Sequence, residues 1–477
     1  MNRAPVDGPQ LELPDGFVLG TATAAAQIEG AVRAGGRSGS IWDEFSAQPG
    51  RILDGSDTSV TADHYHRYRE DVELMRRLGL DAYRFSLSWT RLQPSGTGPL
   101  NPEGVDFYER LIEELLAAGI TPFVTLSHWD LPVEYEAGWL ERDTAARFGE
   151  FAGLVAERFA DRVPAWITIN EPATVTLNGY ALGQHAPGQA MLFDALPTVH
   201  HQLLGHGLAV QALRGAGAKG EIGITNVYSP VVAATQQPED QVMAALFDLV
   251  HNTVFCEPVL RGRYPQPPPQ LSELPPELAG MLDVFDDAPD EDLAAIAEPL
   301  DFYGLNYYMP SVVAAGHGDG TTPDGVSEAM AQVPFELVDL PGCPRTGFGW
   351  PVAPEYFATA LQQMQQRYGD VLPPVYITEN GASYPDDVRD WRVHDVDRID
   401  YIAGHLQAAL DATGQDGQAR GMDLRGFFIW SLLDNWEWAA GFTQRFGLVH
   451  VDFETGRRTP KDSYYWLQQE LGRRRVR

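Results

Sequence analysis

Two short strings in this chain end in a glutamate after an apolar, β-branched run. They are Ile167–Pro172 (Ile-Thr-Ile-Asn-Glu-Pro) and Val375–Gly381 (Val-Tyr-Ile-Thr-Glu-Asn-Gly), and they contain Glu171 and Glu379. A carboxylate at the end of a buried strand is costly unless it has partners or a catalytic task. Two carboxylates that a fold brings together can hydrolyse a glycosidic bond, one as acid and the other as base or nucleophile. Taken singly, either glutamate could equally end its strand in a salt bridge.

The elements that must position these glutamates recur along the chain as eight short β-rich runs. One helix between them is expected to begin at Asn101 and Pro102, a cap and a first-turn proline, and to stop at Gly119. We predict strands over residues 17–23, 81–87, 120–127, 164–170, 220–228, 301–307, 373–379 and 425–431. Strands that alternate with helices in this way predict an α/β fold, a single closed (β/α)8 TIM barrel domain over residues 1–477. An open doubly wound sheet is the alternative, but no Gly-X-Gly-X-X-Gly follows a strand to support it.

The barrel prediction places both glutamates on one face. Glu171 ends the fourth strand and Glu379 the seventh, so both should point into the pocket at the C-terminal end of the strands. The Pro/Gly-rich stretches 264–276 and 314–349 are predicted to be long barrel loops, the second of them on this catalytic face. Residues able to bind a polyol lie at the ends of most of the strands: Gln27, Arg84, His128, Trp129, Asn170, Asn306, Tyr308, Trp430, Glu437 and Trp438.

The composition limits the class of partner. The chain has 477 residues, of which 44% are hydrophobic, enough for a large core. It carries 66 acidic and 34 basic residues, for a net charge of −32, and only Lys219 and Lys461 are lysines. Such a charge disfavours nucleic acid and anionic membranes, so we expect a neutral substrate. A homo-oligomer is left open.

Cysteine content and apolar patterning indicate the compartment. Cys256 and Cys343 are too few for a disulfide framework in a chain of 477 residues, so we predict free thiols. Residues 1–15 are polar and contain no apolar stretch of signal-peptide type. No run approaches the roughly 18 apolar residues of a membrane span. We therefore expect a cytoplasmic protein.

Motifs along most of the chain resemble glycoside hydrolase family 1, the β-glucosidase family. The Asn-Glu-Pro and Thr-Glu-Asn-Gly pair at this spacing is highly specific, as is Trp436-Glu437-Trp438. The other matching strings are Gln27–Gly30, Ser40–Asp43, Asp63–Tyr68, Tyr83–Trp89, Thr125–Asp130 and Trp430–Trp438.

The resemblance implies a retaining exo-β-glycosidase without cofactor or metal. Glu171 matches the general acid/base and Glu379 the nucleophile, while Arg84, Asn306 and Tyr308 match groups that support the nucleophile. The implied substrate is a neutral β-glucoside or cello-oligosaccharide, as in cellulose degradation. The residues that match the family's sugar-binding site are Gln27, His128, Trp129, Asn170, Trp430, Glu437, Trp438 and Phe446.

Several alternatives use the same scaffold. A 6-phospho-β-glycosidase would replace Glu437 and supply a nearby lysine, but the chain keeps Glu437 and its next lysine is Lys461, so this activity is disfavoured. A non-catalytic sugar-binding barrel would lose one of the two catalytic glutamates. Preference for galactosides or fucosides and transglycosylation stay open, because Leu19, Ala26 and residues 131–139 depart from the family pattern near the sugar.

Histidine and acidic clusters raise the question of a metal, but their spacing does not fit one. The histidines lack a third ligand at a zinc spacing, and residues 286–292 lack the order of a calcium loop and are predicted to be solvated. The histidines concerned are His64, His66, His200, His201 and His206. Among the tryptophans, Trp42 is left undecided, and core packing is predicted for Trp89, Trp166, Trp350 and Trp436.

Overall fold

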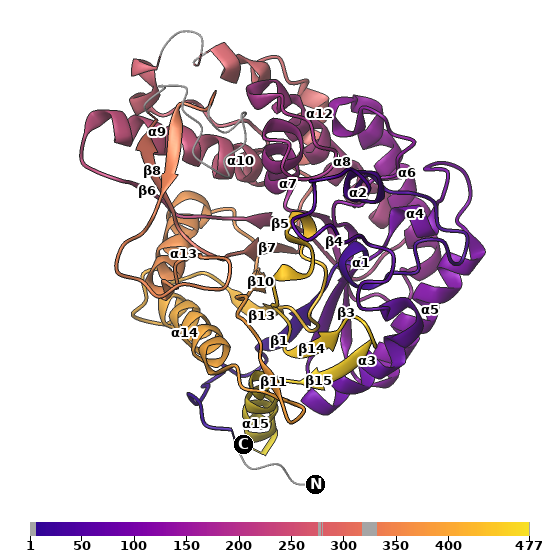
Figure 1. Cartoon of the computed structure of the whole chain (residues 1–477). Coiled ribbons are helices and arrows are strands. Elements are labelled where there is room, and N and C mark those ends of the chain that lie inside the picture. The colour runs from indigo at the N-terminus through magenta and orange to yellow at the C-terminus, as the bar shows by residue number, and fades with distance from the viewer. Residues whose placement is uncertain (1–5, 275–277, 279, 317–331, 477) are drawn as a thin grey trace.

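Eight parallel strands close into a barrel at the centre of the molecule (Figure 1). The computed structural model describes residues 6–274, 278, 280–316 and 332–476. Its barrel closes because β1 pairs with both neighbours, Gly20 opposite Ala82 of β2 and Val18 opposite Gly426 of β13. In their order around the barrel, the strands are β1 (Val18–Ala22), β13 (Leu424–Trp430), β10 (Val375–Asn380), β7 (Phe302–Asn306), β5 (Glu221–Val227), β4 (Ala165–Asn170), β3 (Thr121–Ser127) and β2 (Ala82–Ser86).

Every predicted strand overlaps one of these eight, which confirms the (β/α)8 prediction. That residues 1–477 form a single domain stays a prediction.

Helices cover the outside of the barrel and connect successive strands. In α5 the Asn101 side chain accepts a hydrogen bond from the Glu103 amide, Pro102 lies in the first turn, and Gly119 follows the end with φ 74°. These are the cap, start and stop that the sequence predicts. The longer helices are α3 (His64–Leu78), α5 (Pro102–Ala117), α6 (Arg142–Phe159), α8 (Pro197–Gly215), α9 (Pro238–Asp248), α10 (Val254–Arg261), α13 (Pro354–Tyr368), α14 (Val396–Thr413) and α15 (Asp462–Val476).

Short elements lie within the connections. Two form hairpins, β11 (Val388–Arg389) with β12 (Arg392–Val393) and β14 (Val449–Asp452) with β15 (Arg457–Pro460). The short helices are α1 (Ala25–Ile28), α2 (Ile41–Ser46), α4 (Trp89–Leu92), η1 (Gly138–Leu140), α7 (Pro172–Thr174), η2 (Val175–Ala181), η3 (Leu192–Ala195), η4 (Leu249–Thr253), η5 (Pro269–Glu273), η6 (Gly280–Phe285), α12 (Asp290–Ile296) and η8 (Trp438–Thr443).

Aromatic side chains fill the barrel below the strand ends. The ring centroids of Phe123 and Phe428 are 4.9 Å apart, and those of Phe302 and Tyr376 are 5.3 Å apart. Gly20 leaves room for this layer, because a Cβ there would lie 2.6 Å from the Phe428 ring. The barrel interior is therefore a packed core, on which the polar strand ends rest.

Two predicted loops contain regular structure. The stretch 314–349 includes β9 (Phe335–Val338), which pairs with β8 (Ser311–Ala315), and β8 in turn pairs with β6 (Val231–Ala233). These strands lie within the long loop that the sequence predicts, and their pairing joins segments far apart in sequence. Residues 317–331 of that stretch lie outside the described residues, as do 275 and 276 of the stretch 264–276, which holds η5.

One helical run is long enough to cross a membrane, contrary to the prediction that no such run exists. Residues 238–261, made of α9, η4 and α10, meet the length and composition of a span among the described residues. However, 67% of its most apolar window is buried inside the protein. Core helices of soluble proteins pass the same test, so this run is weak support for a membrane span.

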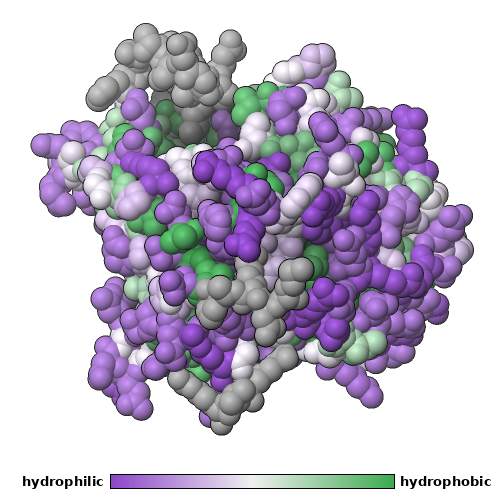
Figure 2. All heavy atoms as spheres, turned by 60° about the horizontal axis from the view of Figure 1, so that its bottom comes forward, coloured by the Kyte–Doolittle hydropathy of each residue, from purple (hydrophilic) through white to green (hydrophobic). Residues whose placement is uncertain are grey.

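Residues 9–11 pack against the C-terminal helix α15, which lies at the bottom of Figure 1. The Leu11 amide donates to Glu470 Oε2 (2.8 Å), and Trp466 Nε1 donates to the Pro9 carbonyl (2.9 Å). Hydrophilic residues dominate the face shown in Figure 2, with small hydrophobic patches between them. This surface agrees with the strongly acidic composition.

Candidate active site

Glu171 lies where β4 ends and α7 begins. Its backbone has φ 46°, and its side chain is 5% exposed. Asn306 Nδ2 donates to Glu171 Oε1 (2.6 Å), and Thr174 Oγ1 donates to Oε2 (2.7 Å). Both partners are neutral, so the carboxyl has hydrogen bonds but no direct cation among the described residues.

Glu379, in β10, has different partners. Arg84 Nη1 forms a buried ion pair with Glu379 Oε1, and the Tyr308 hydroxyl donates to Oε2 (2.7 Å). Arg84 also donates to the Thr378 carbonyl (3.1 Å) and to Asn170 Oδ1, which fixes the guanidinium in place. The ion pair stabilises the ionised form of Glu379.

These surroundings separate the acid strengths of the two carboxyls. Burial, followed by the negative charge of Glu379, raises the pKa of Glu171 to about 7. Burial also raises the pKa of Glu379, but Arg84 and Tyr308 oppose that increase. A protonated Glu171 beside an ionised Glu379 is thus the favoured arrangement near neutral pH.

A third carboxyl, Glu437, lies in the same cavity. Gln27 Nε2 donates to Glu437 Oε2 (3.3 Å), to Asn435 Oδ1 (3.1 Å) and to the Trp436 carbonyl (3.0 Å). Burial, then the charges of Glu379 and Glu171, raises the pKa of Glu437 to about 8. A protonated Glu437 can both donate and accept hydrogen bonds, which suits a sugar hydroxyl.

His128 and Asn170 form a hydrogen-bonded pair beside Glu171. Asn170 Nδ2 donates to His128 Nε2 (3.0 Å), and Asn170 Oδ1 accepts from Asn306 Nδ2 (3.2 Å). Burial, then the charge of Arg84, holds the pKa of His128 well below its usual value. The imidazole is therefore neutral, with the Asn170 amide orientation set by its neighbours.

An aromatic wall completes the site. The rings of Trp129 and Trp438 are 4.5 Å apart between centroids, and Trp42 packs behind Trp438 at 4.6 Å. Both Trp129 and Trp438 have positive φ, 78° and 49°, at sharp turns after their strands. Such faces can pack on the apolar side of a pyranose.

The structure brings the predicted site residues together. The residues behind the cavity surface, which hold the lining groups through the contacts above, are Gln27, Arg84, Asn170 and Asn306. The residues that line one cavity of about 550 Å³ are His128, Trp129, Glu171, Tyr308, Glu379, Trp430, Glu437, Trp438 and Phe446.

The sequence analysis missed part of this cavity. Trp350, predicted to pack the core, lines the cavity, and its ring lies 4.7 Å from Phe348 and 5.5 Å from Tyr308. Phe348 lies at the end of the stretch predicted as a loop and Trp350 directly follows it, where no periodicity indicates which side chains turn inward. Trp89, Trp166 and Trp436 are buried.

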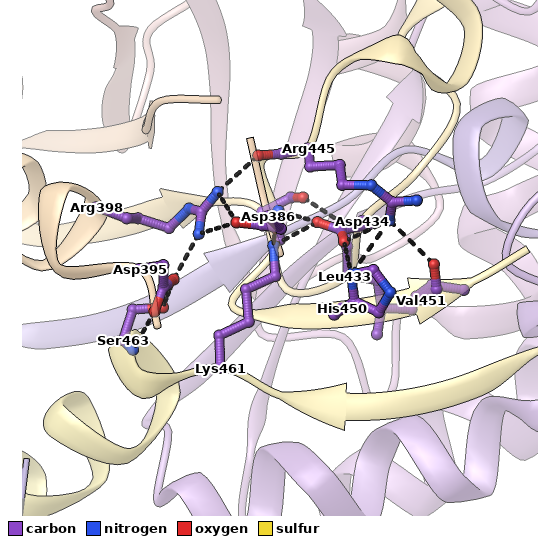
Figure 3. A network of polar contacts seen from close by, with 12 residues as sticks. Asp386, Asp395, Arg398, Leu433, Asp434, Arg445, His450, Val451, Lys461 and Ser463 are labelled. Carbon is purple, nitrogen blue, oxygen red and sulfur yellow. Dashed lines mark hydrogen bonds and ion pairs between the residues drawn. The ribbon is translucent and has the colours of Figure 1, made fainter. Parts of the chain in front are cut away.

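A buried ionic cluster holds the loop that carries Glu437 and Trp438 (Figure 3). Asp434 Oδ1 accepts from Lys461 Nζ (2.7 Å), and Asp434 Oδ2 accepts from Arg445 Nη1 (2.9 Å). Lys461 also pairs with Asp386, in the loop after β10. Burial alone would raise the pKa of Asp434, but Lys461, His450 and Arg445 hold it well below its usual range. The cluster thus joins the loops that follow Glu379 and Trp430.

Oxygen and nitrogen ligands gather in the same cluster, but a lysine lies among them. Asp386, Asp434 and His450 lie close enough to hold a metal ion. Figure 3 shows the Lys461 ammonium between the two carboxylates, where it supplies the positive charge that a cation would bring.

The other groups considered as metal ligands have protein partners. His64 contacts Asp71 (2.7 Å) and His206 contacts Thr168 (2.7 Å). Asp292, predicted to be solvated, is instead buried against Arg142 and His200, because α12 packs on α8.

The sequence matches the profile of glycosyl hydrolase family 1 over residues 10–475. The chain belongs to glycosyl hydrolase family 1. It is 42% identical over 459 residues to beta-glucosidase A of Thermotoga maritima, covering 95% of this chain and 96% of that one. The family assignment makes the protein a hydrolase of glycosidic bonds.

Solved structures of this family share the fold. The psychrophilic beta-glucosidase of Micrococcus antarcticus superposes with a TM-score of 0.88 at 43% identity, covering 97% of both chains. The beta-glucosidase of Thermotoga maritima in complex with glucoimidazole gives a TM-score of 0.85 at 39% identity, covering 96% of this chain and 98% of that one.

Proposed function

We propose that this family 1 hydrolase is a retaining β-glucosidase, which removes terminal non-reducing β-D-glucosyl residues from neutral glucosides. The observation that carries the proposal is the pair of buried carboxyls with unlike partners, Glu379 on Arg84 and Glu171 on neutral groups. A retaining mechanism needs such a pair, one ionised and one protonated. The names of the similar proteins support glucose as the sugar.

The chemistry follows from the two environments. Glu379 attacks the anomeric carbon while Glu171 gives its proton to the leaving oxygen, and a covalent glycosyl-enzyme forms. Esterified Glu379 has lost its charge, so the pKa of Glu171 falls and its carboxylate can take a proton from water. Water then releases the sugar with its configuration retained. Asn170, beside Glu171, is the residue we propose for the 2-hydroxyl, a contact that strengthens in the transition state.

The glycone end of the site suits an unphosphorylated sugar. Glu437, held from behind by Gln27, offers hydrogen bonds to its outer hydroxyls, beside Phe446. The lysine that a 6-phosphate would need is absent among the described lining residues. Lys461 is fully buried between Asp386 and Asp434. Lys219 is exposed and lies two residues before the start of β5. The 6-phospho-β-glycosidase alternative therefore lacks support.

The finer assignments belong to the same proposal. Galactosides and fucosides are secondary substrates and transglycosylation a side reaction, since the same residues serve them. Cello-oligosaccharides are substrates of the proposed enzyme, as cellulose degradation requires. A cytoplasmic location is supported by unpaired Cys256 and Cys343, because reduced thiols persist in that compartment. A homo-oligomer stays open.

A panel of nitrophenyl β-glycosides tests the proposal. It contains the glucoside, galactoside, fucoside and the 6-phospho-glucoside, each measured for kcat/KM. We expect kcat/KM for the plain glucoside to exceed that for the 6-phospho-glucoside by orders of magnitude. Faster turnover of the 6-phospho-glucoside would contradict the assignment. In a separate test the enzyme is treated with a chelator; a loss of activity that added metal restores would also contradict it.

A further inference from the structure

The active-site cavity continues past the catalytic carboxyls along a second, apolar wall. Its described side chains include Leu177, Phe193, Val227, Phe247, Met309 and Phe335. We call these six residues the apolar wall. The mechanism above uses none of them.

Separate elements build the apolar wall. Leu177 comes from η2 and Phe193 from η3, both in the connection after β4. Phe247 comes from α9 and Phe335 from β9, and their rings meet edge to face with centroids 5.3 Å apart. A surface that three barrel connections assemble is part of the fold and not a single exposed side chain.

The barrel order places this wall on the side of the leaving group. Apart from Asn170 at the end of β4, the sugar-binding residues follow β1, β3 and β13, whereas the apolar wall lies at and after the ends of β4, β5 and β7. In the ring of eight strands β5 lies opposite β1. Glu171, at the end of β4, must face the leaving oxygen to protonate it, so the group attached to that oxygen lies along the apolar wall. This step rests on the proposed function.

Polar groups next to the apolar wall are mostly committed to protein partners. Ser229 Oγ donates to the Met309 carbonyl (2.8 Å), and the Tyr228 hydroxyl donates to Gln363 (3.1 Å). His251 Nδ1 contacts Asn252 Oδ1 (2.9 Å). Among the described lining residues on this side, the amides of Asn178 and Gln184 have no such partner and are free to bind a ligand. A second glucose, with hydroxyls all round its ring, would leave many of them unpaired in this space.

We propose that the apolar wall selects β-glucosides whose leaving group is an apolar alcohol, an aryl or medium-chain alkyl group, over those whose leaving group is another sugar. Each methylene that leaves water for such a wall should favour the complex by about fourfold. Cello-oligosaccharides are then the poorer substrates of the same site.

A homologous series of n-alkyl β-glucosides, from methyl to octyl, tests this inference in the wild-type enzyme beside cellobiose. We expect kcat/KM to rise by about twofold to fourfold per methylene until the wall is covered. Octyl glucoside should exceed cellobiose by at least about tenfold. A flat alkyl series, or cellobiose as good as octyl glucoside, would overturn the inference. If no glucoside of any kind is cleaved, the proposed function itself has failed.

Two variants locate the effect. Leu177→Asn keeps the size of a half-buried wall residue and adds an amide, so the ratio of octyl to methyl glucoside kcat/KM should fall by about tenfold. Val227→Thr, a nearly isosteric change, should lower the same ratio and serves if the first variant folds poorly. The control is Leu116→Asn on the outer face of α5, where the leucine is 42% exposed. The inference fails if the ratio falls as much in the control as in the wall variants. It also fails if the ratio falls in neither wall variant.

Discussion

At the residue scale, the protein gives two identical side chains opposite tasks through their neighbours. Glu379 touches the Arg84 cation and the Tyr308 hydroxyl, whereas Glu171 touches the Asn306 amide and the Thr174 hydroxyl. The Arg84 cation keeps Glu379 ionised as the nucleophile. The negative charge of Glu379 in turn helps to keep Glu171 protonated. The roles therefore depend on contacts that single substitutions can remove.

Thr174→Val should move the alkaline limb of the pH profile. Glu171 must be protonated to act as acid, so kcat/KM should fall as the pH rises through its pKa of about 7. The Thr174 hydrogen bond lowers that pKa, and its removal should shift the limb to higher pH. The measurement is kcat/KM for nitrophenyl glucoside against pH.

Thr176→Val is the matched control, because Thr176 bonds to Thr198 and not to Glu171. Its profile should coincide with the wild type. An unmoved or lowered limb in Thr174→Val would show that this hydroxyl does not tune the acid.

Prediction from sequence was most successful at this scale where residue type and strand position agreed. Glu171, Glu379 and the polar strand ends could be placed because parallel barrel strands deliver their C-terminal ends to one face. Thr174 has no comparable signal, since a threonine one turn beyond a glutamate is common in helices. Asn306 was predicted at its strand end as a support of Glu379, but its hydrogen bond to Glu171 was not foreseen. The raised pKa of Glu437 also needs the structure, because it arises from burial and from two charges remote in sequence.

At the scale of elements, the loop after β13 depends on a buried ionic cluster outside the site. Lys461 pairs with Asp434 of that loop and with Asp386 of the loop after β10, and all three side chains are buried (Figure 3). Removal of one partner from a buried ion pair leaves the others uncompensated. The position of Glu437 and Trp438 is thereby tied to a residue near the C-terminal helix.

Lys461→Met should lower the free energy of unfolding by about 3–5 kcal/mol at neutral pH. Burial alone would raise the pKa of Asp434, and Lys461 is the strongest of the groups that lower it, so the Asp434 pKa is higher in the variant than in the wild type. The stability that the lowered pKa gives the wild type is lost as the pH falls, so the deficit of the variant should shrink in acid. Urea unfolding at several pH values measures it.

Lys219→Met removes the chain's other lysine, which is exposed, and should leave the stability unchanged. A comparable loss of stability in both variants would mean that the change in net charge, and not the buried cluster, causes it. An unchanged Lys461→Met would mean that the cluster does not hold the loop.

Element prediction worked for local periodicity and failed for distant pairing. The eight barrel strands are continuous apolar runs bounded by turn residues, which periodicity detects. β9 is short, and its two exposed residues lie between two partly buried ones, so it shows no alternation. Its partner β8 is separated from it by residues 317–331, outside the described part of the chain. The apolar wall escaped prediction for the same reason, since its residues converge from separate connections.

At the scale of the whole molecule, the acidic surface sets the response to salt. The net charge is −32 at pH 7, and hydrophilic residues dominate the face in Figure 2. Like charges on a folded surface repel one another and oppose compaction. The same charge favours a neutral substrate over an anionic one.

Sodium chloride should raise the melting temperature at pH 7. A rise from about 0.01 M to about 0.15 M shortens the Debye length from about 30 Å to about 8 Å and screens the repulsion. We expect an increase of a few degrees by differential scanning calorimetry. The increase should be smaller at a pH where the carboxyls are partly protonated. A melting temperature that falls with salt at pH 7 would show that attractive ion pairs outweigh the net charge.

The central claim is that Glu379 is the nucleophile and Glu171 the acid/base of a retaining enzyme. The most direct test is the anomeric configuration, read by proton NMR, of the azide product that each truncated variant makes from dinitrophenyl β-glucoside. In Glu379→Gly, azide should enter from the vacated face and give the α-azide. In Glu171→Ala, the glycosyl-enzyme still forms, and azide should displace Glu379 to give the β-azide. The opposite pair of anomers would show that the two roles are exchanged and would contradict the account.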